Sequence, residues 1–535
     1  MMKRFMIFSY FCVLLLHVSH INGEIFSSVY KMSIISQEEG KLLSAFNRYI
    51  STQTRDQKQI SFELQRLLND LEPIVTESSL DQRYPENPIN AFHLIGRFVY
   101  KWPVVYSSIL CEDCTLDVPA SDLNATYQIV TRNIAHWPNE YDVQASAQAL
   151  LRLRTFYYFN IDEAINGILF DEHCQPLNPS QVLKIVSIAK DSSMLNEARL
   201  WSEALLRRLP FTSFLDENVN EVAILKILSS IYEQAGLNHK ASAILRNFIK
   251  DDKKGHSEVL NENEQNDINE EEEADISFVR EEYDDNYKQL CRENRKTPKE
   301  SSKLYCYLSE TVIPYYKGKV EIANLQPKIF LFHDVISEGE ALHLRNEGSK
   351  EFHRSKLGQG QLSGSEIDRT RVSETAWLHD KPGIVKRATH RVGLLTGLKT
   401  KSSPLLSNTE PFQIVNYGIG GMYNPHYDTF EKPLWGPISE DEPDDLRGTG
   451  DRIATWLFYL NDVKVGGATV FPNINTRIPV IQGGAAFWYN LLPSGVTDNR
   501  TMHAGCPVVI GSKWVGNKWI REAGQMFRRP CDLLP

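Results

Sequence analysis

The sequence lacks a long hydrophobic run. The apolar stretch from Phe5 to about Val18 is too short for a comfortable membrane span, and no later segment approaches the roughly eighteen apolar residues that a spanning helix needs. We therefore expect no membrane span.

An excess of positive charge is also missing. The chain has 58 Lys and Arg against 68 Asp and Glu, for a formal net charge of −10. Proteins that bind nucleic acids neutralise phosphates with basic side chains, so we expect no nucleic-acid partner.

The last residues are Leu533-Leu534-Pro535, so a retention signal of the Lys-Asp-Glu-Leu type is missing from the end of this sequence. Residues 1–23 combine a basic start, a short apolar core and a small final residue, which is the pattern of a secretory signal peptide. We expect a soluble, lumenal or secreted protein; if it stays in the endoplasmic reticulum lumen, a partner must hold it there. Asn124 and Asn499 begin glycosylation sequons that are usable in that compartment.

Cysteines are few, and their number is odd once the signal is removed. The seven that remain are Cys111, Cys114, Cys174, Cys291, Cys306, Cys506 and Cys531. In a compartment that favours disulfides, at least one thiol is left unpaired or intermolecular. Cys111 and Cys114 have the spacing of a redox or zinc motif, but nothing around them fits either, so we favour a structural role.

A chain of 535 residues is too long for a single core and indicates three or more domains. In the helical segment 24–75, seven apolar residues share the a and d positions of one heptad frame: Leu43, Phe46, Ile50, Ile60, Leu64, Leu67 and Leu71. One interpretation is a core helix packed in its own domain. The other, which we favour, is a coiled-coil arm, so residues 24–170 are predicted to be a helical dimerisation domain.

Residues 175–255 continue as helices with short polar breaks. The segment from Leu225 to Ala241 fits the repeat of about 34 residues that forms tetratricopeptide (TPR) helical hairpins. Such repeats build a concave groove for extended peptides, and the alternative is a plain helical spacer. An acidic linker is predicted over residues 256–310, because its Glu- and Asn-rich sequence buries nothing.

From about residue 320 to 535 the pattern changes to short β-branched and aromatic runs divided by Gly and Pro. Many short strands with turn signals indicate a β-sandwich or a barrel-like double sheet. The sequence is therefore predicted to fold as helical domains followed by a β domain.

The β-rich part contains the motif Asn424-Pro-His426-Tyr-Asp428. His426 and Asp428 are two residues apart, so on a strand both point to one face. With His503 from later in the chain they would form the two-histidine, one-carboxylate facial triad of non-haem Fe(II) oxygenases. Lys513 lies ten residues after His503 and, on a continuous strand, would point to the same side and pair with a co-substrate carboxylate.

Long runs around these residues are similar to a known family, the collagen prolyl 4-hydroxylase α subunits. The matching runs are 413–428, 452–460, 466–472 and 503–519 in the catalytic part, 371–377 before it, and 87–92 and 149–154 near the N-terminus. The resemblance covers essentially the whole mature chain. It implies that residues 320–535 form a double-stranded β-helix (jelly-roll) dioxygenase domain.

The resemblance also implies the metal and the co-substrates. His426, Asp428 and His503 match the family's iron ligands, and the expected cofactors are Fe(II), 2-oxoglutarate, O2 and L-ascorbate as the reductant. Imidazole and carboxylate ligands that leave metal positions open suit Fe(II).

Four further positions match the 2-oxoglutarate pocket. Lys513 matches the lysine that pairs with the distal carboxylate, Tyr417 and Thr469 match residues that line the pocket, and Trp519 matches an aromatic at its edge. A cation is required there because a buried charge without a partner is costly.

Two disulfides, Cys506–Cys531 and Cys291–Cys306, are implied by the resemblance, and Cys111, Cys114 and Cys174 stay unassigned. The implied partner is protein disulfide isomerase as the β subunit of an α2β2 tetramer.

The implied activity is 4-hydroxylation of peptidyl proline in collagen-like secretory proteins. Members that bind collagen carry several tyrosines in the repeat domain, whereas residues 180–250 contain only Tyr232, which is predicted to contact the peptide. A non-collagen substrate and a non-catalytic subunit that binds proline-rich chains are the alternatives.

Overall fold

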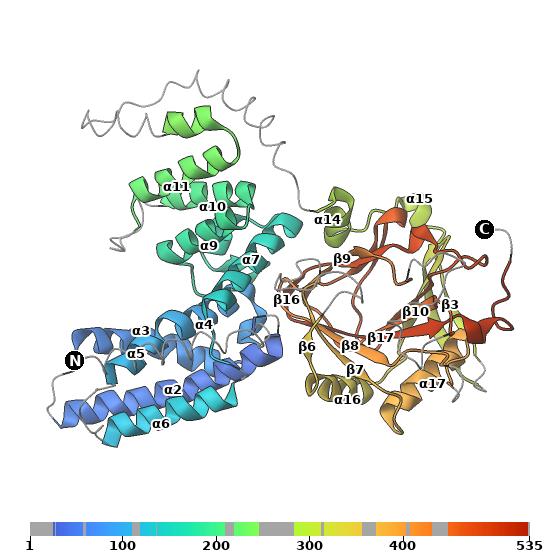
Figure 1. Cartoon of the computed structure of the whole chain (residues 1–535), viewed down its shortest axis with the longest axis horizontal. Coiled ribbons are helices and arrows are strands. Elements are labelled where there is room, and N and C mark those ends of the chain that lie inside the picture. The colour runs from blue at the N-terminus through green and yellow to red at the C-terminus, as the bar shows by residue number, and fades with distance from the viewer. Residues whose placement is uncertain are drawn as a thin grey trace, which may run out of the picture.

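A computed structural model describes residues 25–26, 28–56, 60–109, 118–134, 136–208, 219–244, 283–311, 315–355, 371–402, 407–430 and 448–532. The predicted signal peptide, Cys111, Cys114 and most of the acidic stretch lie outside these residues. Helices fill the N-terminal part of the chain and strands fill the C-terminal part, and the two parts lie side by side (Figure 1).

The helical part is built mainly from longer helices joined by short connections. These are α2 (Val29–Arg55), α3 (Phe62–Leu80), α4 (Pro88–Tyr100), α5 (Trp102–Ile109), α6 (Val118–Asn133), α7 (Glu140–Tyr157), α8 (Ile161–Ile165), α9 (Pro179–Asp191), α10 (Leu195–Arg208) and α11 (Glu221–Gln234). A two-stranded sheet, β1 (Ile168–Leu169) and β2 (Glu172–His173), lies between α8 and α9.

Local sequence signals set the helix ends. Asn139 caps α7 and Asn178 caps α9, and in both helices the third residue reaches back to close a capping box. Pro179 occupies the first position of α9, where its missing N–H leaves no hydrogen bond unmade.

The heptad residues pack inside the chain itself. The predicted helix is two helices, α2 and α3, and Leu43, Phe46, Ile50 and Leu67 are buried in the same apolar core as residues of α4 and α7. Their burial corresponds to the packed-helix interpretation, so the coiled-coil arm that we favoured is wrong for these residues. That residues 24–170 mediate dimerisation stays a prediction.

Helices α9, α10 and α11 pack in sequence order. Tyr232, on α11, is 6% exposed and packs against Leu228 and Ala241. Little of its ring is exposed, so Tyr232 contributes to the packing of this hairpin. Its contact with the peptide stays a prediction.

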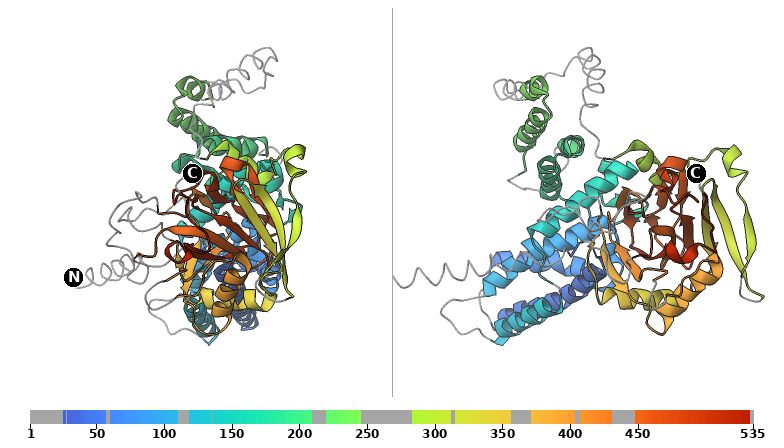
Figure 2. Two further views of the ribbon diagram at one scale, coloured as in Figure 1. Left: turned by 90° about the vertical axis from the view of Figure 1, so that its right-hand side faces the viewer. Right: turned by 45° about the vertical axis from the view of Figure 1, so that its right-hand side comes forward.

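The C-terminal part begins with two short helices, α14 (Asp285–Arg292) and α15 (Pro298–Ser301), and then forms a nine-stranded antiparallel sheet. Its strands, in spatial order, are β3 (Cys306–Glu310), β4 (Lys317–Leu325), β5 (Lys328–His333), β14 (Ala485–Tyr489), β10 (Arg452–Tyr459), β17 (Lys513–Arg521), β8 (Phe412–Tyr417), β7 (Glu374–Leu378) and β6 (His353–Arg354). The β3–β4 edge lies far from the helical part (Figure 2).

Smaller sheets face this large one. A four-stranded sheet has the order β13 (Thr476–Ile478), β12 (Thr469–Phe471), β15 (His503–Gly505) and β9 (Tyr423–His426), and a third sheet pairs β11 (Val465–Gly466) with β16 (Val508–Ile510).

Side-chain alternation buries both faces of the large sheet. On β10, Trp456 and Phe458 pack under helices α16 (Glu338–Ser349) and α17 (Ile384–Thr396). Leu457 and Tyr459, which point the other way, pack against the smaller sheets. Burial on both faces explains why β10 reads as a nearly continuous apolar run, and the inner face is where polar side chains can be enclosed.

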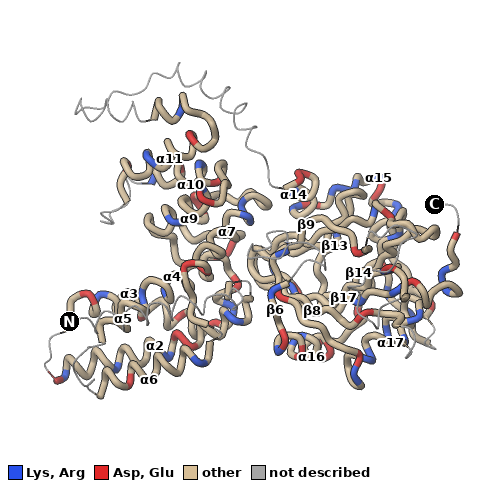
Figure 3. Tube along the Cα trace, viewed as in Figure 1, with Lys and Arg blue, Asp and Glu red and all other residues tan. Residues whose placement is uncertain are grey.

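Within the described part of the chain, no helix is long and apolar enough to cross a membrane. Lys and Arg are mixed with Asp and Glu along both the helices and the strands (Figure 3).

One disulfide joins Cys291, on α14, to Cys506, which follows β15. Both cysteines are buried, whereas Cys306 and Cys531 are exposed free thiols. The predicted pairs Cys506–Cys531 and Cys291–Cys306 are therefore wrong. The C-terminal tail contacts the turn near residue 493, where Asp532 donates its backbone N–H to the Pro493 carbonyl at 2.9 Å.

We predict that peptide mapping without reduction recovers a cross-linked peptide containing Cys291 and Cys506, because burial side by side protects that pair from exchange. Mass spectrometry after proteolysis, with thiols blocked beforehand, checks this. Recovery of Cys506 linked to Cys531 as the main species would contradict it.

Candidate active site

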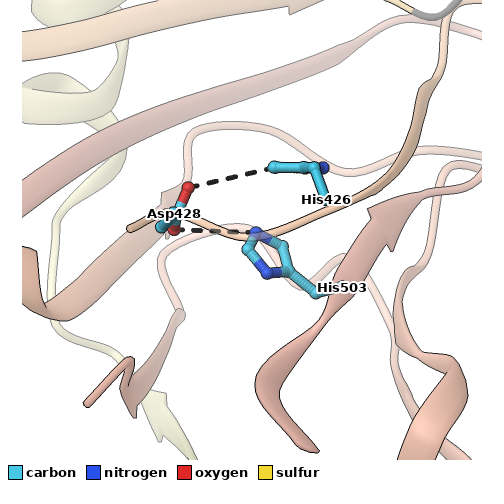
Figure 4. A group of neighbouring side chains, drawn as sticks. All are labelled: His426, Asp428 and His503. Atoms are coloured by element: carbon cyan, nitrogen blue, oxygen red, sulfur yellow. Dashed lines mark ion pairs between the residues drawn. The ribbon is translucent and has the colours of Figure 1, made fainter. Parts of the chain in front are cut away.

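Two histidines and an aspartate converge at the end of the four-stranded sheet. His426 closes β9, and His503 opens β15 directly opposite it in the antiparallel register. Asp428 lies in the turn just beyond β9. The Nε2 atoms of His426 and His503 are 3.9 and 3.6 Å from the two oxygens of Asp428, and the ligand atoms of all three residues lie within 4.8 Å of one another (Figure 4).

Backbone carbonyls orient both imidazoles. The Nδ1 of His426 is 2.8 Å from the Asn424 carbonyl, and the Nδ1 of His503 is 3.1 Å from the Thr501 carbonyl. A proton on each Nδ1 leaves each Nε2 with a free lone pair, which is the tautomer that binds a metal. Burial, assisted by His503, lowers the pKa of His426 to about 3, so this ring is neutral.

Aspartate 428 is buried but ionised. Burial by itself would raise its pKa, but the neighbouring His503, His426 and Arg452 outweigh it and leave the pKa below the ordinary value. The Thr455 hydroxyl donates to Oδ2 at 2.6 Å and accepts from the Asn490 amide at 2.9 Å. This hydrogen bond fixes the carboxylate with Oδ1 toward His426 and Oδ2 toward His503.

Lys513 is enclosed on the inner face of the large sheet. It is 3% exposed, its Nζ donates to the Thr469 hydroxyl at 3.2 Å, and Tyr459 donates to the same hydroxyl at 3.0 Å. Tyr417 is its cross-strand partner, with the ring 5.6 Å from Nζ. No carboxylate among the described residues pairs with this lysine, and burial lowers its pKa to about 7. The arrangement is a cation without an anion, which suits an anionic ligand.

Trp519 lies six residues along β17 from Lys513, on the same face, and pairs with Thr455 across the sheet. The guanidinium of Arg452 stacks on its ring at 3.7 Å, donates to the Asp428 carbonyl at 3.3 Å and pairs with buried Glu410 at 2.7 Å. Arg452 therefore ties the Asp428 turn to β10 and β17.

The structure brings the predicted side chains together, but not by the strand geometry that their spacing suggested. His503 and Lys513 do not share a continuous strand: β15 belongs to the four-stranded sheet and β17 to the nine-stranded one. The two residues meet the same interior from facing sheets. Thr455 and Tyr459 were missed, although they alternate along β10 with apolar neighbours, a pattern that marks buried polar positions on one face.

The two sequons differ in environment. Asn499 is exposed, whereas Asn124 is half-buried on α6 and its Oδ1 accepts a hydrogen bond from Tyr106 at 3.0 Å.

Comparison with known proteins gives two family matches. Residues 28–171 match the model of the prolyl 4-hydroxylase alpha-subunit, N-terminal region, and residues 412–521 match the 2OG-Fe(II) oxygenase superfamily. The second range contains all three converging residues together with Lys513.

Full-length relatives match along nearly the whole chain. Prolyl 4-hydroxylase subunit alpha-1 of Bos taurus is 31% identical over 541 residues, covering 95% of this chain and 95% of the relative, and the Homo sapiens protein of that name gives the same figures. A crystal structure of a viral collagen prolyl hydroxylase from Paramecium Bursaria Chlorella virus-1 is 26% identical, covering 36% of this chain and 95% of that one, with a TM-score of 0.27. Because this TM-score is low, the family is assigned from the sequence matches alone.

The domain match and the triad define a 2-oxoglutarate- and Fe(II)-dependent dioxygenase. Together with the match over nearly its whole length, they show that the chain belongs to the prolyl 4-hydroxylase α-subunit family.

Replacing Thr455 by Val should weaken metal binding about tenfold, because residues that hydrogen-bond a metal ligand typically contribute that much to affinity. Titration calorimetry with Mn²⁺ under anaerobic conditions measures it. Thr455→Ser keeps the hydroxyl and should bind as the wild type does. Equal affinity of the Val variant would show that the hydroxyl does not hold Asp428.

Proposed function

We propose that this chain is the catalytic subunit of an enzyme that hydroxylates C4 of peptidyl proline in collagen-like secretory proteins. The observation that carries the proposal is the joint burial of the triad and of an unpaired lysine between facing sheets, in a chain related to prolyl 4-hydroxylase α subunits along its length.

The donor set fits Fe(II). Two imidazoles and one carboxylate, each fixed by a hydrogen bond, would hold the metal on one side and leave the other side open. Bound there with 2-oxoglutarate and O2, the metal supplies oxidation of an unactivated C–H bond, with release of succinate and CO2.

The co-substrate pocket would be formed by Lys513, Thr469, Tyr417 and Tyr459. The Lys513 ammonium would take the distal carboxylate of 2-oxoglutarate, and the Thr469 and Tyr417 hydroxyls would donate the remaining hydrogen bonds. The Tyr459 hydroxyl, which donates to Thr469, would hold that threonine in place. Their nearly complete burial excludes water and strengthens this pairing. Trp519 and Arg452 would form the edge of the site nearest Asp428.

The finer architecture belongs to the same proposal. The two facing sheets would be a double-stranded β-helix over residues 320–535, and residues 175–255 would be a TPR-like domain that presents the proline-rich chain. Helices α9, α10 and α11, packed in sequence order, support the second assignment.

Location and assembly are likewise proposed from the family. The chain would act in the endoplasmic reticulum lumen as part of an α2β2 tetramer with protein disulfide isomerase, with L-ascorbate keeping the iron reduced. The exposed sequon at Asn499 would be the readier of the two for glycosylation.

One observation favours a second candidate function, proline hydroxylation in a secreted protein other than collagen. Tyr232 is the single tyrosine of residues 180–250, and it is packed inside its hairpin. A groove without exposed tyrosines offers few aromatic faces to a polyproline II helix.

Protein co-expressed with protein disulfide isomerase should release succinate and add one oxygen atom to the proline before glycine in a (Pro-Pro-Gly)n peptide. Peptide mass spectrometry with Fe(II), 2-oxoglutarate and ascorbate is the assay, and His503→Ala is the blank. Succinate release without peptide oxidation would favour the second candidate. If a folded tetramer gave neither succinate release nor peptide oxidation, the proposal that the chain is catalytic would be refuted.

Binding of 2-oxoglutarate should weaken as pH rises above about 7, with a slope approaching tenfold per pH unit. The sign follows from Lys513: burial lowers its pKa to about 7, so above that pH the free lysine is mostly neutral and must take up a proton to pair with a carboxylate. Calorimetry in buffers of different ionisation enthalpy measures this uptake. If the affinity for 2-oxoglutarate did not change with pH and no proton were taken up, its distal carboxylate would not pair with Lys513.

A further inference from the structure

Helix α14 packs over the sheet that carries the two histidines. Tyr287, Leu290 and Cys291 are at most 1% exposed and share an apolar cluster with Val470 of β12 and Ala504 of β15. In Figure 1 the helix lies beside β9, at the boundary between the helical part and the strands.

The Tyr287 hydroxyl reaches the backbone of both histidine strands. It donates to the Gly505 carbonyl of β15 at 2.8 Å and lies 3.5 Å from the Tyr423 carbonyl of β9. Gly505 and Tyr423 are a cross-strand pair, and the next pair in that ladder is His503 with His426. The register shifts between these two pairs, so the ladder alone holds the histidines less tightly than a regular one would.

Cys291 adds a covalent link one helical turn further along. Residues 287 and 291 are four apart and lie on the same face of α14. The disulfide joins Cys291 to Cys506, the residue that follows Gly505, and the Cys506 N–H donates to the Ala468 carbonyl at 2.8 Å. The hydroxyl and the disulfide therefore fix two successive residues at the end of the His503 strand.

Helix α14 is itself anchored to α7 in the helical part. Arg292 donates to the Phe156 carbonyl at 2.9 Å, and the Phe156 ring meets Tyr287 edge-on at 5.0 Å. The same helix α7 reaches the strand side directly, since Arg152 donates to the Gly420 carbonyl at 2.7 Å and Tyr157 to the Pro507 carbonyl at 2.7 Å.

We propose that Tyr287 and the Cys291–Cys506 disulfide are positioning elements for the metal site, through which α14 holds β9 and β15 at the spacing that His426 and His503 need. The inference rests on the proposed function, because it takes the triad to be the metal site. It assigns to the helical part a role in metal affinity, through α7 and α14, in addition to any role in peptide binding.

The test compares two conservative variants in the full chain with its β subunit. Tyr287→Phe removes the hydroxyl and keeps the ring. Tyr84→Phe is the matched control, because it removes a buried hydroxyl that accepts from Arg97 inside the helical part and contacts neither α14 nor the histidine strands. Direct Mn²⁺ binding by calorimetry is the first readout. The Fe(II) concentration for half-maximal succinate release, and kcat at saturating Fe(II), are the second.

Tyr287→Phe should bind Mn²⁺ about tenfold more weakly and need correspondingly more Fe(II), as expected for a residue that supports metal ligands. Its kcat at saturating Fe(II) and its KM for 2-oxoglutarate should match the wild type, a split that general loss of stability would not produce. Tyr84→Phe should bind Mn²⁺ like the wild type.

Wild-type metal affinity in Tyr287→Phe would overturn the proposal. If that variant does not fold, Cys291→Ser/Cys506→Ser decides: weaker Mn²⁺ binding supports the proposal, and unchanged binding overturns it. Absence of Mn²⁺ binding by the wild type would instead refute the metal site, and with it both proposals.

Discussion

The antiparallel pairing of β9 with β15 is the constraint on which the active site depends. It sets His426 opposite His503, with ring centroids 4.3 Å apart, and brings Asp428 to them from the turn that follows β9. Tyr423 stacks on His426 at 3.6 Å, and Trp488 packs edge-on against His503 at 4.8 Å. Packing thus fixes the position of each ring, while a backbone carbonyl fixes its proton.

Charge within the interior is arranged before any ligand arrives. Burial normally raises the pKa of a carboxyl group. The charged neighbours of Asp428 nevertheless keep its pKa low, and Arg452 and Arg521 do the same for Glu410. Lys513 has no such partner among the described residues. The site therefore combines a buried lysine that lacks a carboxylate partner with a buried carboxylate between two histidines, which matches an anionic co-substrate and a divalent metal.

Sequence reasoning predicted the side chains that converge because their residue types are rare in combination, but it could not predict the contacts that hold them. His426, Asp428, His503 and Lys513 were predicted from spacing and resemblance. Thr455 and Tyr287 were missed, because a threonine in an apolar strand or a tyrosine after an acidic stretch carries no signal of what it touches.

The errors have a common physical origin, which is tertiary packing. The heptad pattern of α2 and α3 is typical of a coiled coil and also of two helices packed in a core. Only the packing of α4 and α7 against these residues shows that the second interpretation applies. Cysteine pairing likewise depends on which elements meet: α14 lies on β15, so Cys506 pairs with Cys291 and the tail cysteine is left free.

The most direct test of the account is a crystal structure of the protein prepared without oxygen with Fe(II) and 2-oxoglutarate, with the metal located by anomalous scattering. The account predicts iron bound by His426, Asp428 and His503, with the distal carboxylate of 2-oxoglutarate within hydrogen-bonding distance of the Lys513 Nζ. Iron bound by other residues, or that carboxylate paired with a different cation, would contradict it.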